Sequence, residues 1–277
     1  MRVETITSAQ NPKIKNLLSL QEKSRTRREQ GLFVVEGRRE LEHALEAGFR
    51  PRTVFVCPEI TGDRWPVGAG HDESHDSAIP GLTGNLTVVE IPESLYRKVA
   101  YRESTEGVIA EMEVRERRLE DLQLSEHPLV MVLESVEKPG NLGAVLRSAD
   151  AARADAVIVC DPLTDLWNPN LIRASLGGIF TVPTVCASSE ETIAWLKAHG
   201  IRILTAQLQD SAWYYDIDMT GGTALVMGTE STGLTDRWRA AADAHIRIPM
   251  LGRLDSLNVS VSAAILLFEA VRQRNAI

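Results

Sequence analysis

The sequence predicts an α/β fold, with a mostly parallel sheet covered by helices on both faces. The first observation is a set of short apolar runs, among them LVMVLE (129–134), ADAVIVC (154–160) and GTALVMG (222–228), which have the length of buried strands. The second is that helical patterns separate these runs, as expected for parallel strands joined by crossover helices. Because such sheets bind ligands beyond the carboxyl ends of their strands, the loops after these runs are the first candidates for a functional site.

The first half of the chain predicts a small α/β domain at residues 1–113. A helix begins at Asn11-Pro12, because proline is favoured in the first helical turn and apolar residues follow at helical spacing. Residues 58–85 are rich in Gly, Pro, Asp and Ser and predict a long exposed loop. The remaining elements expected here are strands at 32–37, 52–57, 86–91 and 107–114 and helices at 38–48 and 92–100.

Residues 114–127 are highly charged and precede a proline, which predicts a linker, and 128–277 form the second domain. After the strand at 129–134, helices and strands alternate regularly. The further elements expected are helices at 142–152, 169–177, 190–200 and 234–241, strands at 154–160, 181–185, 201–206, 222–228 and 245–250, and a last helix from Leu257 to Arg274.

Composition excludes several classes of protein. Hydrophobic residues make up 44% of the chain, which excludes a wholly disordered protein. The formal charge is −8, which excludes a uniformly basic nucleic-acid-binding surface. Its three cysteines are odd in number and widely spaced, which predicts small buried side chains in a reduced compartment. The N-terminus lacks the apolar core of a signal peptide, and the apolar run 261–268 is far shorter than the roughly 20 residues of a membrane helix. A cytoplasmic protein is expected.

Familiar motifs of other enzymes are missing. No G-x-G-x-x-G follows a strand, no Gly-Lys dipeptide marks a P-loop, and no G-x-S-x-G occurs, so a standard nucleotide-binding sheet and an α/β hydrolase are disfavoured. His199 and His245 therefore have no nucleophile motif with which to form a Ser/His/Asp catalytic triad. His71 and His75 have helical spacing, but they lie in the loop-like segment, and no metal site is predicted.

A first candidate cluster, EKPGNLGAVLRSADA, spans residues 137–151. Pro139-Gly140 predicts a turn, Asn141 is suited to cap the helix that follows, and Arg147 is the one cation in a helix otherwise lined with small and apolar residues. From the residues alone, Arg147 is either an ordinary solvated arginine or a functional group.

Two further clusters follow the late strands. In LVMGTESTGL (225–234), glycines allow close approach of a ligand to the backbone, although a plain strand–turn–helix has the same pattern. In IPMLGRLDSLNVSVSAAILLFEA (248–270), Asn258, Ser260 and Ser262 alternate with apolar residues in a first helical turn. The alternative is an amphipathic helix capped by Ser256 with an exposed polar face.

In this order, the three clusters resemble the three motifs of the SpoU-type (TrmH-type) RNA ribose 2′-O-methyltransferases of the SPOUT class. NPNLIRASLGGIFTVP (168–183) is similar to the family's middle segment, and the resemblance covers residues 129–274. The N-terminal half, with ITSAQNPKIKNLLSL and FVVEGRRELEHALEAG, is similar to the small substrate-binding domain that precedes many rRNA methyltransferases of this family. Lys138 departs from the acidic residue that relatives often carry before the proline, which bears on RNA contacts and not on the fold.

The resemblance implies a deep trefoil knot, against the general rule that chains are unknotted, and S-adenosylmethionine as the cofactor. It implies Arg147 and Asn141 as catalytic residues. Because an arginine keeps its proton, we expect Arg147 to clamp the neighbouring phosphate and stabilise the developing alkoxide, and Asn141 to orient the hydroxyl or the arginine. The cofactor-binding residues implied are Gly228, Glu230, Gly233, Ile248, Leu257, Asn258 and Ser260.

The implied partners are RNA, with rRNA of the 23S type expected, and a second copy of the chain bound through the methyltransferase domain. Residues 1–28 hold seven Lys or Arg against two Glu, and this basic segment is expected to contact phosphates through Lys13, Lys15, Lys23, Arg25, Arg27 and Arg28. Two alternatives stay open, a tRNA methyltransferase and a non-catalytic RNA-binding assembly factor. The presence of Asn141, Arg147, Glu230 and Asn258 argues against the second.

Overall fold

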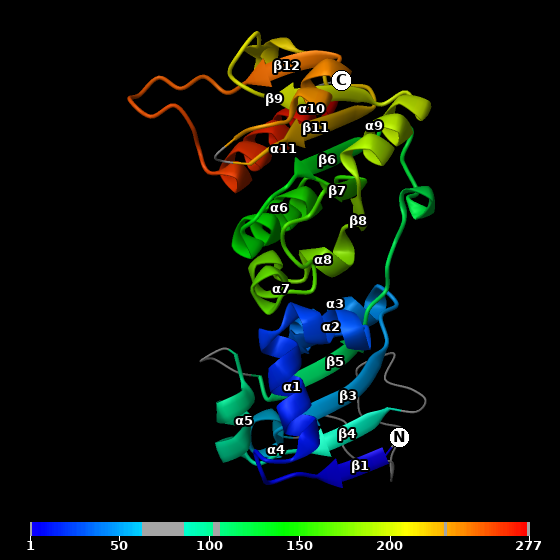
Figure 1. Ribbon diagram of the computed structural model, residues 1–277, viewed down its shortest axis with the longest axis vertical. Coiled ribbons are helices and arrows are strands. Elements are labelled where there is room, and N and C mark those ends of the chain that lie inside the picture. Colours follow the sequence, from blue (N-terminus) through cyan, green and yellow to red (C-terminus); the bar gives the residue numbers. More distant parts are fainter. Residues whose placement is uncertain (1, 63–85, 102–105, 230–231, 276–277) are drawn as a thin grey trace. The chain divides into compact units, whose positions relative to one another are not determined.

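The computed structural model describes residues 2–62, 86–101, 106–229 and 232–275. The chain divides into two compact units, one formed by residues 1–115 with Trp167–Pro169 and the other by residues 116–166 and 170–277. Figure 1 labels the helices and strands of both.

The first unit is built on a five-stranded sheet in the order β1-β4-β3-β5-β2. β1, β4 and β3 are parallel, and β5 is antiparallel to β3 and β2. Its elements are β1 (Arg2–Thr5), α1 (Pro12–Glu22), α2 (Ser24–Gln30), β2 (Leu32–Glu36), α3 (Arg38–Glu46), β3 (Pro51–Val56), α4 (Pro58–Thr61), β4 (Thr87–Glu90), α5 (Glu93–Val99) and β5 (Val108–Glu113). The buried Ile14, Leu17 and Leu20 of α1 pack with Phe55 and Tyr96 in the core of this unit.

Three short elements of this unit, β1, α2 and α4, were not predicted. β1 lies at the edge of the sheet with mostly exposed side chains, so it has no apolar pattern, and pairing with β4 holds it in place. α4 follows β3 within the segment predicted as loop, most of which, including His71 and His75, lies outside the described residues.

The second unit is built on a seven-stranded sheet in the order β10-β12-β9-β11-β6-β7-β8, and every pairing in it is parallel. This confirms the predicted α/β class with a mostly parallel sheet. Its strands are β6 (Leu129–Glu134), β7 (Ala156–Cys160), β8 (Thr184–Ala187), β9 (Arg202–Ala206), β10 (Ala212–Trp213), β11 (Thr223–Met227) and β12 (Ala244–Arg247). Its helices are α6 (Pro139–Ala151), α7 (Pro169–Ser175), α8 (Gly178–Thr181), α9 (Ser189–Ala198), α10 (Asp236–Ala241) and α11 (Val259–Asn275).

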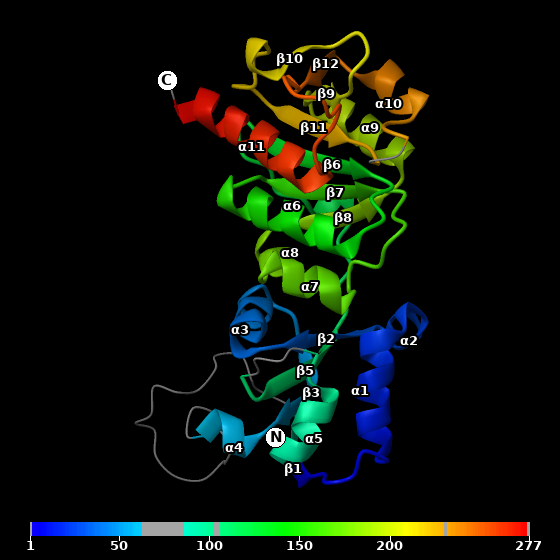
Figure 2. The same cartoon turned by 90° about the vertical axis from the view of Figure 1, so that its left-hand side faces the viewer.

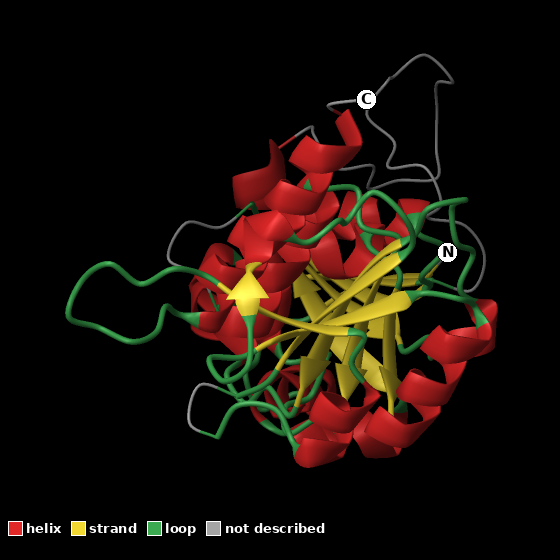
Figure 3. Ribbon diagram, turned by 90° about the horizontal axis from the view of Figure 1, so that it is seen from above, coloured by secondary structure: helices red, strands yellow, loops and turns green. Residues whose placement is uncertain are grey.

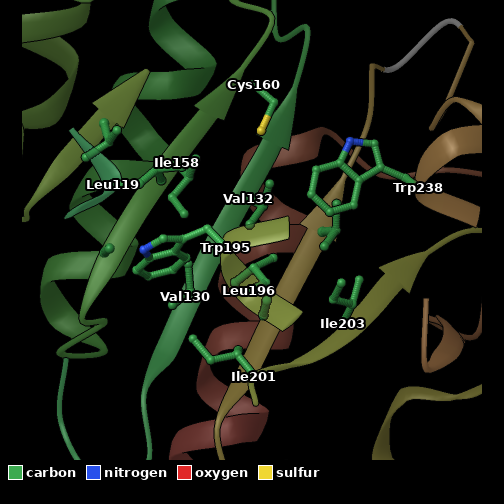
Figure 4. Close-up of a cluster of buried hydrophobic side chains, with 14 of the residues drawn as sticks. Leu119, Val130, Val132, Ile158, Cys160, Trp195, Leu196, Ile201, Ile203 and Trp238 are labelled. Carbon is green, nitrogen blue, oxygen red and sulfur yellow. The ribbon is translucent and has the colours of Figure 1, made fainter. Parts of the chain in front are cut away.

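Helices cover both faces of this sheet. α6 and α11 pack against each other on one face, and α9 and α10 lie on the other (Figures 1 and 2). On the second face, Trp195 and Leu196 of α9 and Trp238 of α10 pack against Val132 and Ile203 of the strands (Figure 4). On the first face, a Cβ at Gly143 of α6 would lie 2.6 Å from the Cβ of Ala174, so only glycine allows α6 to approach α7 this closely.

Several predicted bounds in this unit were wrong. Residues 178–181 form the short helix α8, so the strand expected at 181–185 begins only at Thr184. The last helix begins at Val259 and not at Leu257. The segment between β12 and α11 is drawn orange in Figure 1 and projects from the helices and strands in Figures 1 and 3.

The cysteines partly follow the prediction. Cys57 and Cys160 are buried, but Cys186 is exposed, which corrects the expectation that all three are core residues. Burial raises the pKa of the Cys57 thiol to about 11 and that of Cys160 to about 12. Both are therefore neutral thiols at pH 7 and weak nucleophiles.

Candidate functional site

A cavity of about 380 Å³ lies at the carboxyl ends of three strands of the second unit. Its walls come from the loops after β9, β11 and β12, from the first turns of α11, and from one residue of α10. All these strands run in the same direction, so their carboxyl ends meet at one edge of the sheet, where open α/β sheets bind ligands. The volume lies within the usual range of small-molecule sites, roughly 300–1,000 Å³.

Four of the residues expected at a cofactor site line this cavity: Gly228, Gly233, Ile248 and Leu257. Glu230 lies outside the described residues. Asn258 and Ser260 are adjacent to the cavity wall in sequence but are not part of it. Instead Asn258 caps α11, because its Oδ1 accepts from the backbone N–H of Ser260 at 3.0 Å and from its hydroxyl at 2.6 Å. The alternative of Ser256 as the cap is therefore wrong.

The two described ends of the loop after β11 lie close together. Thr229 and Gly233 form an isolated bridge, the Gly233 N–H donates to the Thr229 carbonyl at 3.1 Å, and Gly233 has a φ of +68°. A Cβ at Gly228 would lie 2.2 Å from the Gly233 carbonyl oxygen. The turn therefore requires glycine at 228, and it presents backbone groups to the cavity.

A second cavity, of about 120 Å³, adjoins the first and is lined by Lys138 and Asn141. The two cavities share Gly228, Thr229 and Val259. The Asn258 Nδ2 donates to the Asn141 Oδ1 at 3.1 Å, so the first and third sequence clusters, 117 residues apart, meet here. Asn141 was predicted to cap α6, but α6 begins at Pro139, and the Asn141 side chain bonds across to the start of α11 instead.

Arg147 is exposed in the middle of α6 and lines neither of these two cavities. It follows Asn141 by six residues, which places the two side chains roughly 120° apart around a helix. Within one chain, the structure therefore brings Asn141 to the cavities but leaves Arg147 facing solvent.

Glu134, which sequence reasoning did not single out, is buried at the carboxyl end of β6. Its Oε2 accepts from the Thr235 N–H at 2.8 Å and its Oε1 from the Thr235 hydroxyl at 2.7 Å. Thr235 precedes α10 and directly follows the cavity residue Leu234. The carboxylate thus anchors the point where the loop after β11 enters α10. The sequence signal is an acidic residue that ends an otherwise apolar run.

We expect Glu134→Ala to lower the free energy of unfolding by about 2–4 kcal/mol, because it leaves the donors of Thr235 without their charged acceptor. Urea unfolding of the full chain measures this. The matched control is Glu190→Ala, since the Glu190 side chain is 81% exposed and should change stability by at most about 0.5 kcal/mol. Equal effects of the two substitutions would contradict the anchoring role.

Three polar residues of the large cavity were also missed: Gln207, Arg239 and Arg247. Arg247 ends β12, but the strand was predicted to run to Met250, so the sequence did not place Arg247 at a strand end. The other two have ordinary sequence surroundings, and only the fold brings them to the cavity.

The basic residues of the first unit differ in exposure. Lys15, Lys23, Arg25 and Arg28 are exposed, although Arg25 pairs with Glu29, and Lys13 pairs with Glu4. Arg27 is only 2% exposed, and its Nη1 donates to the carbonyls of Leu20 and Gln21. Because this guanidinium is used inside the fold at the end of α1, the expectation that Arg27 contacts phosphate was wrong.

Among the described residues, no helix has the length and apolar character needed to cross a membrane.

Residues 128–268 match the model of the SpoU rRNA Methylase family, and residues 11–110 match the MRM3-like substrate binding domain. The chain is 28% identical to the 23S rRNA (guanosine(2553)-2′-O)-methyltransferase RlmP of Bacillus subtilis, over 96% of this chain and 98% of the relative. It resembles a crystal structure of an RNA 2′-O ribose methyltransferase, with a TM-score of 0.80 and 39% identity over 98% of this chain and 100% of that one. It also resembles an AdoMet-bound rRNA methyltransferase from Sinorhizobium meliloti, with a TM-score of 0.83 and 30% identity over 98% of both chains.

Proposed function

Because this chain belongs to the SpoU rRNA Methylase family, we propose that it methylates a ribose 2′-hydroxyl of rRNA, of the 23S type, with S-adenosylmethionine as the methyl donor. The observation that carries the proposal is the adjoining pair of cavities, one lined by the glycine turn and the other by Asn141. The first has the size of a small-molecule site, and the second is small and has Asn141 and Lys138 in its wall. We infer that the reaction takes place in the cytoplasm.

The residues of the large cavity fit S-adenosylmethionine. The turn at Gly228 presents backbone groups, and Ile248 and Leu257 supply apolar surface, which suits a ligand with a flat base and a sugar. When bound, this cofactor supplies an electrophilic methyl group. The chain's own residues then have to hold the ribose in place and stabilise the charge that develops on its oxygen.

We assign these tasks to Asn141 and Arg147. The bond from Asn258 fixes the Asn141 amide beside the junction of the cavities, so Asn141 is suited to orient a hydroxyl there. Arg147 lines neither cavity, so we propose that it acts on the RNA backbone: its fork of donors clamps the phosphate next to the target ribose.

Exposed apolar groups of the second unit support a homodimer. Val261 and Phe268 lie two turns apart on α11 and are about half exposed, and Leu251 and Leu254 of the preceding loop are 95% and 77% exposed. Contiguous exposed apolar surface is typical of interfaces. We propose that a second copy of the chain covers it.

We expect Phe268→Asp to convert the dimer into a monomer, because it places a charge on the proposed apolar interface. Light scattering coupled to size-exclusion chromatography measures the mass. Asn275→Asp, which adds a charge at the exposed end of the same helix, is the control and should leave the mass unchanged. A Phe268→Asp variant with the mass of the unmodified protein would exclude this interface.

We also propose that the chain is knotted between β11 and α11. The strand order supports this: β12 lies outside β9, whereas β11 lies between β9 and β6, and α11 returns to pack on β11 and β6. The chain therefore leaves the middle of the sheet and comes back to it.

For the substrate, we propose that the exposed Lys15, Arg25 and Arg28, with Lys13, contact RNA phosphates. The test of the whole proposal is to incubate the purified chain with labelled S-adenosylmethionine and unmodified ribosomal RNA and to map 2′-O-methyl positions. Methylation at a defined 23S nucleotide is expected, and Asn141→Ala should reduce it strongly. Label in tRNA alone, or RNA binding without methylation, would instead support the two alternatives raised by the sequence.

A further inference from the structure

Three buried polar atoms in the wall of the large cavity have no hydrogen-bond partner among the described residues. They are the Nε of Arg239, the Nε of Arg247 and the Oε1 of Gln207. All three residues line the same cavity, although they come from α10, β12 and the loop after β9. Buried polar groups are nearly always paired, because an unpaired one costs free energy. Three at one site indicate a polar ligand.

The charge at this site is positive. The Arg247 guanidinium carbon lies 4.3 Å from the centre of the Trp213 ring, a cation–π contact that helps to hold the guanidinium in place. The Arg239 Nη1 lies 3.7 Å from the Oδ1 of Asp236, whose side chain is fully exposed. A pair of that kind is weak. Among the described residues of the cavity wall, Asp255 supplies the negative charge, from an exposed segment.

Gln207 adds an acceptor to these donors. Its Nε2 donates to the Gln209 carbonyl at 2.9 Å, which orients the amide and leaves Oε1 as the unpaired atom. The wall therefore offers cationic donors and a neutral acceptor. Those are the partners required by a carboxylate and an ammonium group carried on one carbon.

We propose that Arg247 and Arg239 bind the carboxylate of the cofactor's amino-acid end, and that Gln207 Oε1 accepts from its α-ammonium group. This inference rests on the proposed function, since the ligand is that reaction's cofactor. The glycine turn and the apolar part of the cavity then remain for the adenosine end. Bidentate hydrogen bonding of arginine to carboxylate gives orientation as well as affinity, so this end positions the whole cofactor.

The test compares two ligands by calorimetry: S-adenosylhomocysteine, which has the amino-acid end, and 5′-methylthioadenosine, which lacks it. We expect Arg247→Ala to raise the dissociation constant of S-adenosylhomocysteine by about ten- to a hundredfold, as for a lost charged hydrogen bond. The dissociation constant of methylthioadenosine should change by no more than about twofold. Arg239→Ala and Gln207→Leu should show the same selectivity with smaller losses, and Arg247→Lys should recover part of the affinity. The control is Arg237→Ala on the same helix as Arg239, because Arg237 is exposed and lines neither cavity.

Three outcomes would overturn the inference. An equal loss of affinity for both ligands would place the arginines at the adenosine end or show that they only shape the cavity. Unchanged binding of both ligands, with weaker RNA binding, would make Arg247 and Arg239 phosphate contacts. Failure of the unmodified protein to bind either ligand would reject the proposed function itself, and the inference with it. Thermal melting of each variant identifies any loss of affinity that comes from unfolding.

Discussion

Gly228→Ala is expected to raise the dissociation constant for S-adenosylhomocysteine by at least about a hundredfold. The added Cβ would lie 2.2 Å from the Gly233 carbonyl oxygen and 2.5 Å from the Leu234 nitrogen. Both are backbone atoms, so no side-chain rotation relieves the clash and the turn has to open. Opening it breaks the bridge between Thr229 and Gly233 and displaces the backbone that lines both cavities.

Calorimetry with S-adenosylhomocysteine measures this effect, and thermal melting reports the accompanying loss of stability, which we expect to be about 1–3 kcal/mol as for other overpacked sites. Gly221→Ala is the matched control. Gly221 lies before the same strand, has no positive φ, and has open space where the Cβ would be added. If Gly228→Ala bound the ligand within about threefold of the unmodified protein, the turn would not form the cofactor site.

Arg147→Ala is expected to lower kcat for RNA methylation by about a hundred- to a thousandfold, the usual cost of removing a donor that stabilises developing charge. Binding of S-adenosylhomocysteine should be unchanged, because Arg147 lines neither cavity, and stability should be nearly unchanged, because the side chain is exposed. Arg147→Lys should retain only part of the rate, since an ammonium keeps the charge but not the planar fork of donors.

The measurement is single-turnover methylation of ribosomal RNA at saturating cofactor. Arg202→Ala is the control, because Arg202 is an exposed arginine at the amino end of β9, the opposite end of the strand from the cavity. Near-full methylation by Arg147→Lys would refute the argument from fork geometry. Near-full methylation by Arg147→Ala would remove this residue from the mechanism altogether.

The predicted strands of the second unit were found because β6, β7 and β11 are buried on both faces and their sequences are continuously apolar. β1 was missed for the opposite reason. It is an edge strand whose side chains are mostly exposed, and backbone pairing leaves no apolar pattern. The start of α11 was misplaced by two residues, because Ser256 and Asn258 are both good caps and only the fold selects Asn258.

The amino-acid sequence by itself determined most helices and strands of the second unit, with α8 and β10 as exceptions, and two of the segments that line its large cavity. Apolar runs, turns and glycines act within a few residues, so their effects can be read locally. Only the tertiary structure decided which polar side chains meet. It pairs Asn141 with Asn258, buries Arg27 of α2 against the end of α1, and brings Gln207, Arg239 and Arg247 to one wall. Such contacts depend on strand order and on exclusion of water, and neither can be predicted from the residues next to them in the sequence.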